Sequence, residues 1–114
     1  MVPLRLAVHN TDLPSDVRAD IHRRVGRLER WYPRIISCRV TIEVPQRRRR
    51  TDRELYRARV ALSVPQGIIT IDRQPRETLD TALDDVFHAA RRRLLDYAQR
   101  RWSVHRPPAE ELTV

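Results

Sequence analysis

Three stretches of the chain alternate apolar and polar residues, a pattern typical of β-strands with one buried face. They are residues 4–8, 36–44 and 56–64. The predicted buried positions are Leu4, Leu6 and Val8, then Ile36, Cys38, Val40, Ile42 and Val44, then Tyr56, Ala58, Val60, Leu62 and Val64. A short fourth strand, residues 68–72, follows a Pro-Gln-Gly turn in which Gly67 can adopt a positive φ. We therefore predict four strands, each apolar on one face only.

Two further stretches repeat apolar residues at steps of three and four, the period of an amphipathic helix. The first stretch follows the turn residues "HNTDLPSD", so we expect Asp12 or Ser15 as its N-cap and Pro33 at its end. Its apolar stripe comprises Val17, Ile21, Val25, Leu28 and Tyr32. Thr78 is the expected N-cap of the last helix. The stripe of that helix comprises Leu79, Leu83, Val86, Ala90, Leu94 and Tyr97.

The predicted order is β-α-β-β-β-α, which favours an α+β fold in two layers with both helices on one face of a four-stranded sheet. The opposite sheet face would carry Arg5, Arg39, Arg57 and Arg59 among small residues. It offers no aromatic platform, so stacking of single-strand bases on the sheet is not favoured. We assign residues 1–104 to one domain and residues 105–114 to a flexible C-terminal tail, because Pro107 cannot continue a helix.

The charge of the chain is strongly unbalanced. All 23 basic residues are arginine, and 15 acidic residues leave a formal net charge of +8. A GC-rich genome alone could favour arginine over lysine, but it would not explain the excess of positive over negative charge. Guanidinium groups bind phosphate bidentately, so this composition indicates a polyanionic partner.

Several function classes lack the residues they need. Two glycines in 114 residues exclude a P-loop and a G-x-G-x-x-G motif, and Cys38 is the only cysteine. The histidines show no metal-ligand spacing. They are His9, His22, His88 and His105. No segment has the length of a membrane helix or the features of a signal peptide. We expect a cytoplasmic protein with no catalytic residues, metal, cofactor or small-molecule substrate, and no membrane association.

Arginines form a comb on the first predicted helix. Arg23, Arg27 and Arg30 recur at steps of four and three, and Arg34 follows if the last turn holds. Such a row can follow a phosphate backbone, whereas the alternative is a solvated helix face. The absence of interleaved acidic residues on that side favours binding. A second basic run, in a loop, comprises Arg47, Arg48, Arg49 and Arg50, either a mobile loop or an arm that orders on nucleic acid.

The ordered set of motifs resembles a known family. The segment "HNTDLPSDVRADIHRRVGRLERWYPRI" and the strand "SCRVTIEV" are similar to the short ribosome hibernation promoting factors, also called ribosome-associated inhibitor or protein Y and often labelled sigma-factor modulation proteins. Positions of matching residue type are His9, Arg18, Arg27, Leu28, Glu29, Arg30, Arg34 and Ile35. Later, "YRARVALSVPQG" and "TLDTALDDVFHAARRRLLDY" resemble the third strand and second helix, with matches at Ala82, Leu83, Asp84, Arg92, Leu94 and Tyr97. The resemblance covers about the first hundred residues.

The resemblance implies a fold similar to the double-stranded-RNA-binding domain with an extra strand. It also implies a translation silencer that binds small-subunit rRNA in the path of tRNA and mRNA during stress or dormancy, carries out no chemistry and is a monomer off the ribosome. The candidate RNA-binding residues are Arg18, Arg23, Arg24, Arg27, Arg30, Arg34, Arg92, Arg93, Arg100 and Arg101, with loop contacts from Arg47, Arg48, Arg49 and Arg50.

The second helix departs from the family pattern, which usually has Lys or Arg at four of its positions. Here these positions are Ala89, Leu95, Asp96 and Ala98. An aspartate on an RNA-binding face repels phosphate. Two alternatives therefore stay open: a less specific nucleic-acid-binding module on the same fold, and a small interaction domain that dimerises through its open sheet face or edge.

Overall fold

The computed structural model describes residues 2–44 and 55–105, the last five as backbone only. Within these residues the chain forms four strands and two helices in the predicted order β-α-β-β-β-α. The elements are β1 (Leu4–His9), α1 (Ser15–Trp31), β2 (Ser37–Glu43), β3 (Arg57–Val64), β4 (Gly67–Asp72) and α2 (Leu79–His105). The predicted loop 45–54, with Arg47–Arg50, lies outside the described residues, as does the tail beyond His105.

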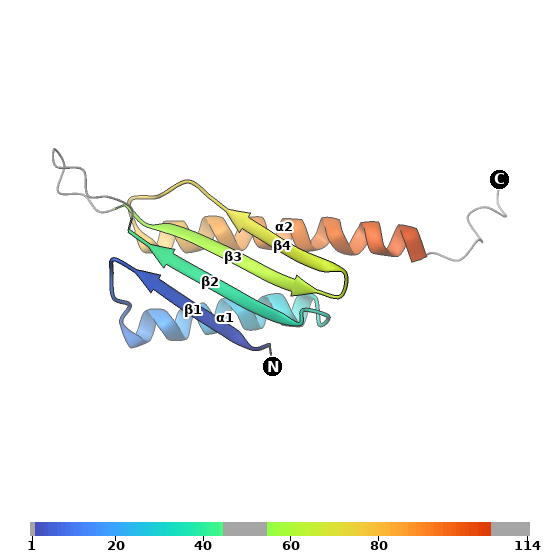
Figure 1. The fold of residues 1–114 in the computed structure, drawn as a ribbon, viewed down its shortest axis with the longest axis horizontal. Coiled ribbons are helices and arrows are strands. Elements are labelled where there is room, and N and C mark those ends of the chain that lie inside the picture. Colours follow the sequence, from blue (N-terminus) through green and yellow to red (C-terminus); the bar gives the residue numbers. More distant parts are fainter. Residues whose placement is uncertain (1, 45–54, 106–114) are drawn as a thin grey trace.

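The four strands form one mixed sheet in the order β1-β2-β3-β4. β1 and β2 are parallel, and α1 makes the crossover between them that a parallel pair requires. β2, β3 and β4 pair in antiparallel fashion. Both helices lie on the same side of the sheet, α1 behind β1 and β2 and α2 behind β3 and β4 (Figure 1). The two-layer α+β prediction is therefore confirmed.

The core fills the space between the sheet and the helices. Alternation along β2 and β3 places every second side chain in it. The strands contribute Cys38, Val40, Ile42, Ala58, Val60 and Leu62, and the helices contribute Ile21, Val25, Leu28, Leu83, Val86, Ala90 and Leu94. Among the described residues no polar or charged residue is buried. The remaining strand positions, which include the four predicted arginines, face away from the helices.

The two helix starts differ from each other. At α2 the Thr81 N–H donates to Thr78 Oγ1 over 3.1 Å, which confirms Thr78 as N-cap. At α1 the N-cap position is Pro14, and no side chain caps the helix, so the prediction of Asp12 or Ser15 is wrong. Pro14 suits this position because its ring fixes φ near −59°, while its carbonyl accepts from the Arg18 N–H over 3.1 Å.

The link between α1 and β2 corrects two further predictions. Tyr32 is extended, because the residue before a proline avoids the helical region, and α1 therefore ends at Trp31. Arg34 consequently lies in the turn after the helix and does not extend the comb. β2 begins at Ser37, so Ile36 lies outside the strand with 55% of its surface exposed, and Ile35 is buried in its place.

Candidate nucleic-acid interface

The outer surface of α1 carries the predicted comb of arginines. Arg23, Arg27 and Arg30 are exposed. They lie on the side of α1 opposite its buried residues, because steps of three and four keep side chains on one face of a helix. Arg34 is also exposed, in the turn that follows α1. The comb therefore exists as a surface feature from Arg23 to Arg30.

Ion pairs distinguish the arginines of this surface. Arg23 Nη2 lies 3.3 Å from Asp20 Oδ1, one turn earlier on the same helix. None of the ion pairs between described residues involves Arg27, Arg30 or Arg34. These three guanidinium groups therefore present uncompensated positive charge to a partner.

Arg24 is a link between the helices rather than a surface cation. Its guanidinium contacts Asp20 on α1 at 2.8 Å and Asp84 on α2 at 2.7 Å, and its side chain is only 20% exposed. The hydrogen bond from Arg24 lowers the pKa of Asp20. Burial opposes the charge on Arg24, but the hydrogen bonds to both aspartates outweigh it and raise the pKa of Arg24. This candidate residue therefore fixes the position of α1 against α2.

A groove of about 320 Å³ lies between the two helices beside the comb. Buried Leu28 and Phe87 line it together with Arg27, Trp31 and Arg91. The Arg91 guanidinium lies 5.9 Å from the centre of the Trp31 ring, within the range of a cation–π contact. The sequence prediction omitted Arg91 from the site. In the sequence, the only indication of its role is that Arg91 lies one helical turn after Phe87. The packing of α1 against α2 is needed to show that this side of α2 borders the comb.

The predicted α2 arginines whose side chains are described lie outside this groove. Arg92 and Arg93 line a separate hollow along α2 and β4, which also contains Asp85 and Asp96. Arg100 Nη2 pairs with Asp96 Oδ2 at 3.2 Å, so the unfavourable aspartate has a basic partner. The structure therefore does not bring these α2 arginines together with the comb.

Two more predicted RNA-binding residues, Arg18 and Arg101, lie near the ends of the helices. Arg18 is exposed, and its Nε donates to the Leu13 carbonyl over 3.2 Å at the start of α1. The side chain of Arg101 lies outside the described residues.

Arginines without an ion pair to a described residue define one surface on the outer side of the two helices, which we call the helix-pair surface. It comprises Arg27, Arg30 and Arg91, with Arg23 and Arg34 at its ends.

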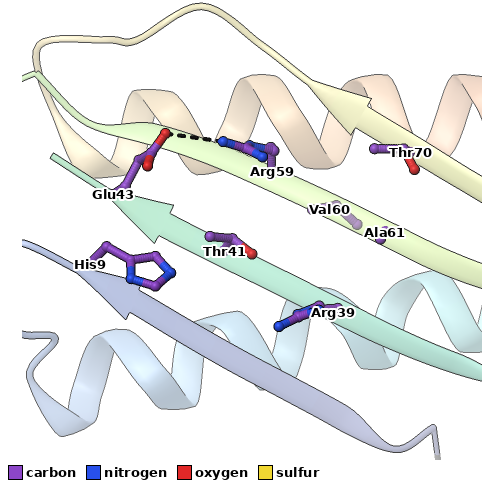
Figure 2. A pocket seen from close by; sticks show the side chains of 8 residues that line it. All are labelled: His9, Arg39, Thr41, Glu43, Arg59, Val60, Ala61 and Thr70. Atoms are coloured by element: carbon purple, nitrogen blue, oxygen red, sulfur yellow. Dashed lines mark hydrogen bonds and ion pairs between the residues drawn. The ribbon is translucent and has the colours of Figure 1, made fainter. Parts of the chain in front are cut away.

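The open sheet face is a second basic surface, and its charge is partly neutralised. Arg59 Nη2 lies 3.2 Å from Glu43 Oε1. Figure 2 shows this pair on the side of the sheet away from the helices. Arg57 donates to Asp72 over 2.9 Å, and this hydrogen bond lowers the pKa of Asp72. A shallow hollow of about 360 Å³ lies beside these residues.

Arg5 and Arg39 differ from the paired arginines of the sheet. They are register neighbours on the parallel strands β1 and β2, and both are exposed. Neither forms an ion pair with another described residue. Like charges opposite each other on neighbouring strands are destabilising. The sheet face thus has one neutral end and one pair of uncompensated cations.

The described residues give no support for a metal site, a reactive cysteine or a membrane helix. No group of three or more metal-ligating side chains occurs among them. Burial raises the pKa of the Cys38 thiol to about 12, so it is protonated and inert near neutral pH. No helix in the described part of the chain is long and apolar enough to cross a membrane.

Comparison with known proteins identifies the family. Residues 4–102 match the family model described as Sigma 54 modulation protein / S30EA ribosomal protein, and the chain belongs to this family. The family consists of ribosome-associated regulators rather than enzymes, in agreement with the prediction that the chain is not an enzyme. The predicted resemblance to the protein Y group is likewise confirmed.

Two solved structures share the fold. The crystal structure of the Thermus thermophilus Protein Y N-terminal domain has a TM-score of 0.69 at 15% identity, covering 85% of this chain and 99% of that one. A ribosomal subunit interface protein from Coxiella burnetii has a TM-score of 0.69 at 11% identity, covering 86% and 99%. No curated protein sequence matches the chain significantly. At these identities the two structures establish only the shared fold. Membership of the family is established by the match to the family model.

Proposed function

We propose that this protein binds the small ribosomal subunit through rRNA and silences translation by occupying the path of tRNA and mRNA. The family match and the similar structure of a ribosomal subunit interface protein support a ribosomal partner. The observation that carries the proposal is the surface formed by Arg27, Arg30 and Arg91, whose charges no described carboxylate compensates. The protein acts in the cytoplasm, during stress or dormancy, and is a monomer off the ribosome.

In the proposed mechanism the bound protein blocks the path of tRNA and mRNA and carries out no chemical step. Arginines on the outer side of the helix pair contact backbone phosphates and release condensed counterions, which contributes affinity without base specificity. The Arg24 link holds α1 against α2, so the cations meet the RNA at a fixed spacing. A shaped rRNA site adds contacts that salt does not screen. Binding at physiological salt therefore distinguishes a ribosomal site from a general attraction to polyanions.

Co-sedimentation with small subunits tests the proposal. The double variant Arg27→Glu/Arg30→Glu is compared with Arg5→Glu/Arg39→Glu, which makes the same charge change on the open sheet face. Each charge-assisted contact contributes about 1.5–3 kcal/mol, so loss of two weakens binding about a hundredfold or more. The salt slope falls by about one for each lost phosphate contact. The sheet-face variant should pellet almost like the wild type, and bound tRNA should compete.

Two results of this experiment would contradict the proposal. Equal loss in the two double variants would mean that net charge, and not the helix-pair surface, drives binding. Pelleting that ignores tRNA would remove the silencing mechanism. Thermal melting of all variants confirms that each one folds.

A less specific nucleic-acid-binding module is the second candidate function. The exposed surface of α2 favours it, because Leu95 is 46% exposed there and Asp96 occupies Arg100. This alternative predicts similar affinity for plain duplex RNA and for small subunits at the same salt concentration, and a loss of about a thousandfold or more between about 50 and 200 mM salt.

A further inference from the structure

Trp31 is the unusual side chain of the groove between α1 and α2. It is the last residue of α1, and 37% of its surface is exposed. The other described aromatic side chains of this region are better covered: Phe87 is 7% exposed, and Tyr32 and Tyr97, both partly buried, pack edge-to-face at 5.9 Å. The exposed part of Trp31 lies in a hollow that is floored by apolar residues and rimmed by arginines.

The arginines around Trp31 fall into two kinds. Arg24 is fixed by Asp20 and Asp84 and lies 6.0 Å above the Phe87 ring, so it belongs to the floor of the groove. Neither Arg27 nor Arg91 forms an ion pair with another described residue, and the Arg91 guanidinium lies over the Trp31 ring. A cation–π contact at an exposed site is weak, so a phosphate can draw Arg91 away from the ring.

The groove combines an exposed aromatic ring with arginines, the groups that bind the base and the phosphates of a single unpaired nucleotide. An aromatic ring offers a stacking surface to any base, and Arg27 and Arg91 line the same groove, so their guanidinium groups are available to the phosphates on either side of that base. Bases inside a duplex have no free face, so the occupant must come from a bulge, a loop or a single strand. A purely phosphate-binding surface would gain nothing from an exposed indole beside a hydrophobic floor.

We propose that the groove between α1 and α2 binds an unpaired RNA base stacked on Trp31, with its flanking phosphates held by Arg27 and Arg91. This inference rests on the proposed RNA-binding function and specifies the RNA feature that the helix pair reads. The comb then positions the RNA backbone, and Trp31 selects a place where the RNA presents an extruded base.

Two RNA hairpins test the inference with the unmodified full chain. They are identical except at a single bulged position, which carries adenine in one and an abasic sugar in the other. Base stacking on an aromatic side chain corresponds to a preference of about five- to a hundredfold, measured as a ratio of Kd values at one salt concentration. We expect the adenine hairpin to bind more tightly by such a factor. Because the wild-type chain is used, this comparison does not depend on a variant folding.

Variants then locate the preference at Trp31. In Trp31→Ala the two hairpins should bind equally, whereas Trp31→Phe should keep most of the preference. In a Trp102→Phe background, which leaves Trp31 as the only indole, the adenine hairpin should quench the fluorescence and the abasic hairpin should not. Equal affinity of the wild-type chain for both hairpins, or quenching by both, overturns the inference.

The failure of this inference is distinguishable from the failure of the proposed function. Small-subunit sedimentation is run in parallel on the same preparations. A chain that pellets with subunits but binds both hairpins equally retains the proposed function and loses the Trp31 site. A chain that fails to pellet, whichever hairpin it prefers, loses the proposed ribosomal function.

Discussion

Replacing Arg24 by methionine removes the link between the helices while keeping an unbranched side chain over Phe87. The wild-type guanidinium pairs with Asp20 on its own helix and with Asp84 on the other. An i,i+4 pair contributes about 0.3–0.5 kcal/mol. The pair with Asp84 adds up to about 1 kcal/mol, discounted because Asp84 is 69% exposed. The contact with Phe87 adds about 0.5 kcal/mol. We therefore expect a loss of about 1–2 kcal/mol.

Thermal unfolding measures this loss, and Arg23→Met is the matched control. Arg23 has the same charge and the same partner, Asp20, but its side chain is 70% exposed, and it forms no ion pair with a described residue of α2. For a domain of this size, about 1 kcal/mol shifts Tm by about 4–8 °C. Arg24→Met should lower Tm by about 4–16 °C, and Arg23→Met by about 4 °C or less. Equal shifts in the two variants would refute the role of Arg24 as a link.

The pH dependence tests whether charge is the cause. The pKa of Asp20 in the folded chain lies below its ordinary value of 3.8, chiefly because of the hydrogen bond from Arg24. A lowered carboxyl pKa contributes stability that is fully present above the unfolded value and is lost as the pH falls through the folded value. The Tm difference between wild type and Arg24→Met should therefore be constant from pH 5 to 7 and should shrink below about pH 4. A difference that persists unchanged at pH 2 would assign the whole effect to packing.

Three further predictions follow from local geometry. Thr78→Ala removes the cap from the Thr81 N–H and should cost about 1 kcal/mol, whereas Thr78→Ser should be nearly neutral in the same thermal melt. Cys38 should react with a thiol reagent at pH 8 only after a denaturant is added, because burial raises its pKa to about 12; fast reaction of the folded chain would contradict its burial. Arg39→Thr should stabilise the chain by about 0.5 kcal/mol by relieving repulsion from Arg5, and the gain should shrink at about 1 M salt; a gain independent of salt would refute repulsion as its source.

The element order could be predicted because each strand and helix keeps one consistent apolar face. Alternation alone places Val40 and Val60 in the core, and both are fully buried. The start of β2 was harder, because Ile35 and Ile36 are both apolar and alternation cannot choose between them. The turn that begins at Pro33 decides in favour of Ile35.

The binding surface was less predictable than the fold. The comb follows from periodicity on a single helix, so its exposure could be foreseen. Arg24 and Arg91 could not be assigned, because a helical repeat gives the angle of a side chain about its own axis but not the direction of the neighbouring helix. For the same reason, the sequence does not reveal that Arg92 and Arg93, which are also candidate RNA-binding residues, line a different hollow.

The parallel pairing of β1 has a consequence for folding. Leu4 is opposite Cys38, so this pair closes only after the chain has passed through α1, whereas β3 and β4 are joined by a two-residue turn. Closing the longer loop costs more chain entropy before any contact compensates it. β1 also lies at the edge of the sheet, and its apolar side chains are only partly buried. In hydrogen exchange, the amides of β1 should therefore lose protection before those of β2 and β3. Arg27 and Trp31 lie on α1, which lies behind β1 and β2, so RNA bound there should slow exchange most at the amides of α1.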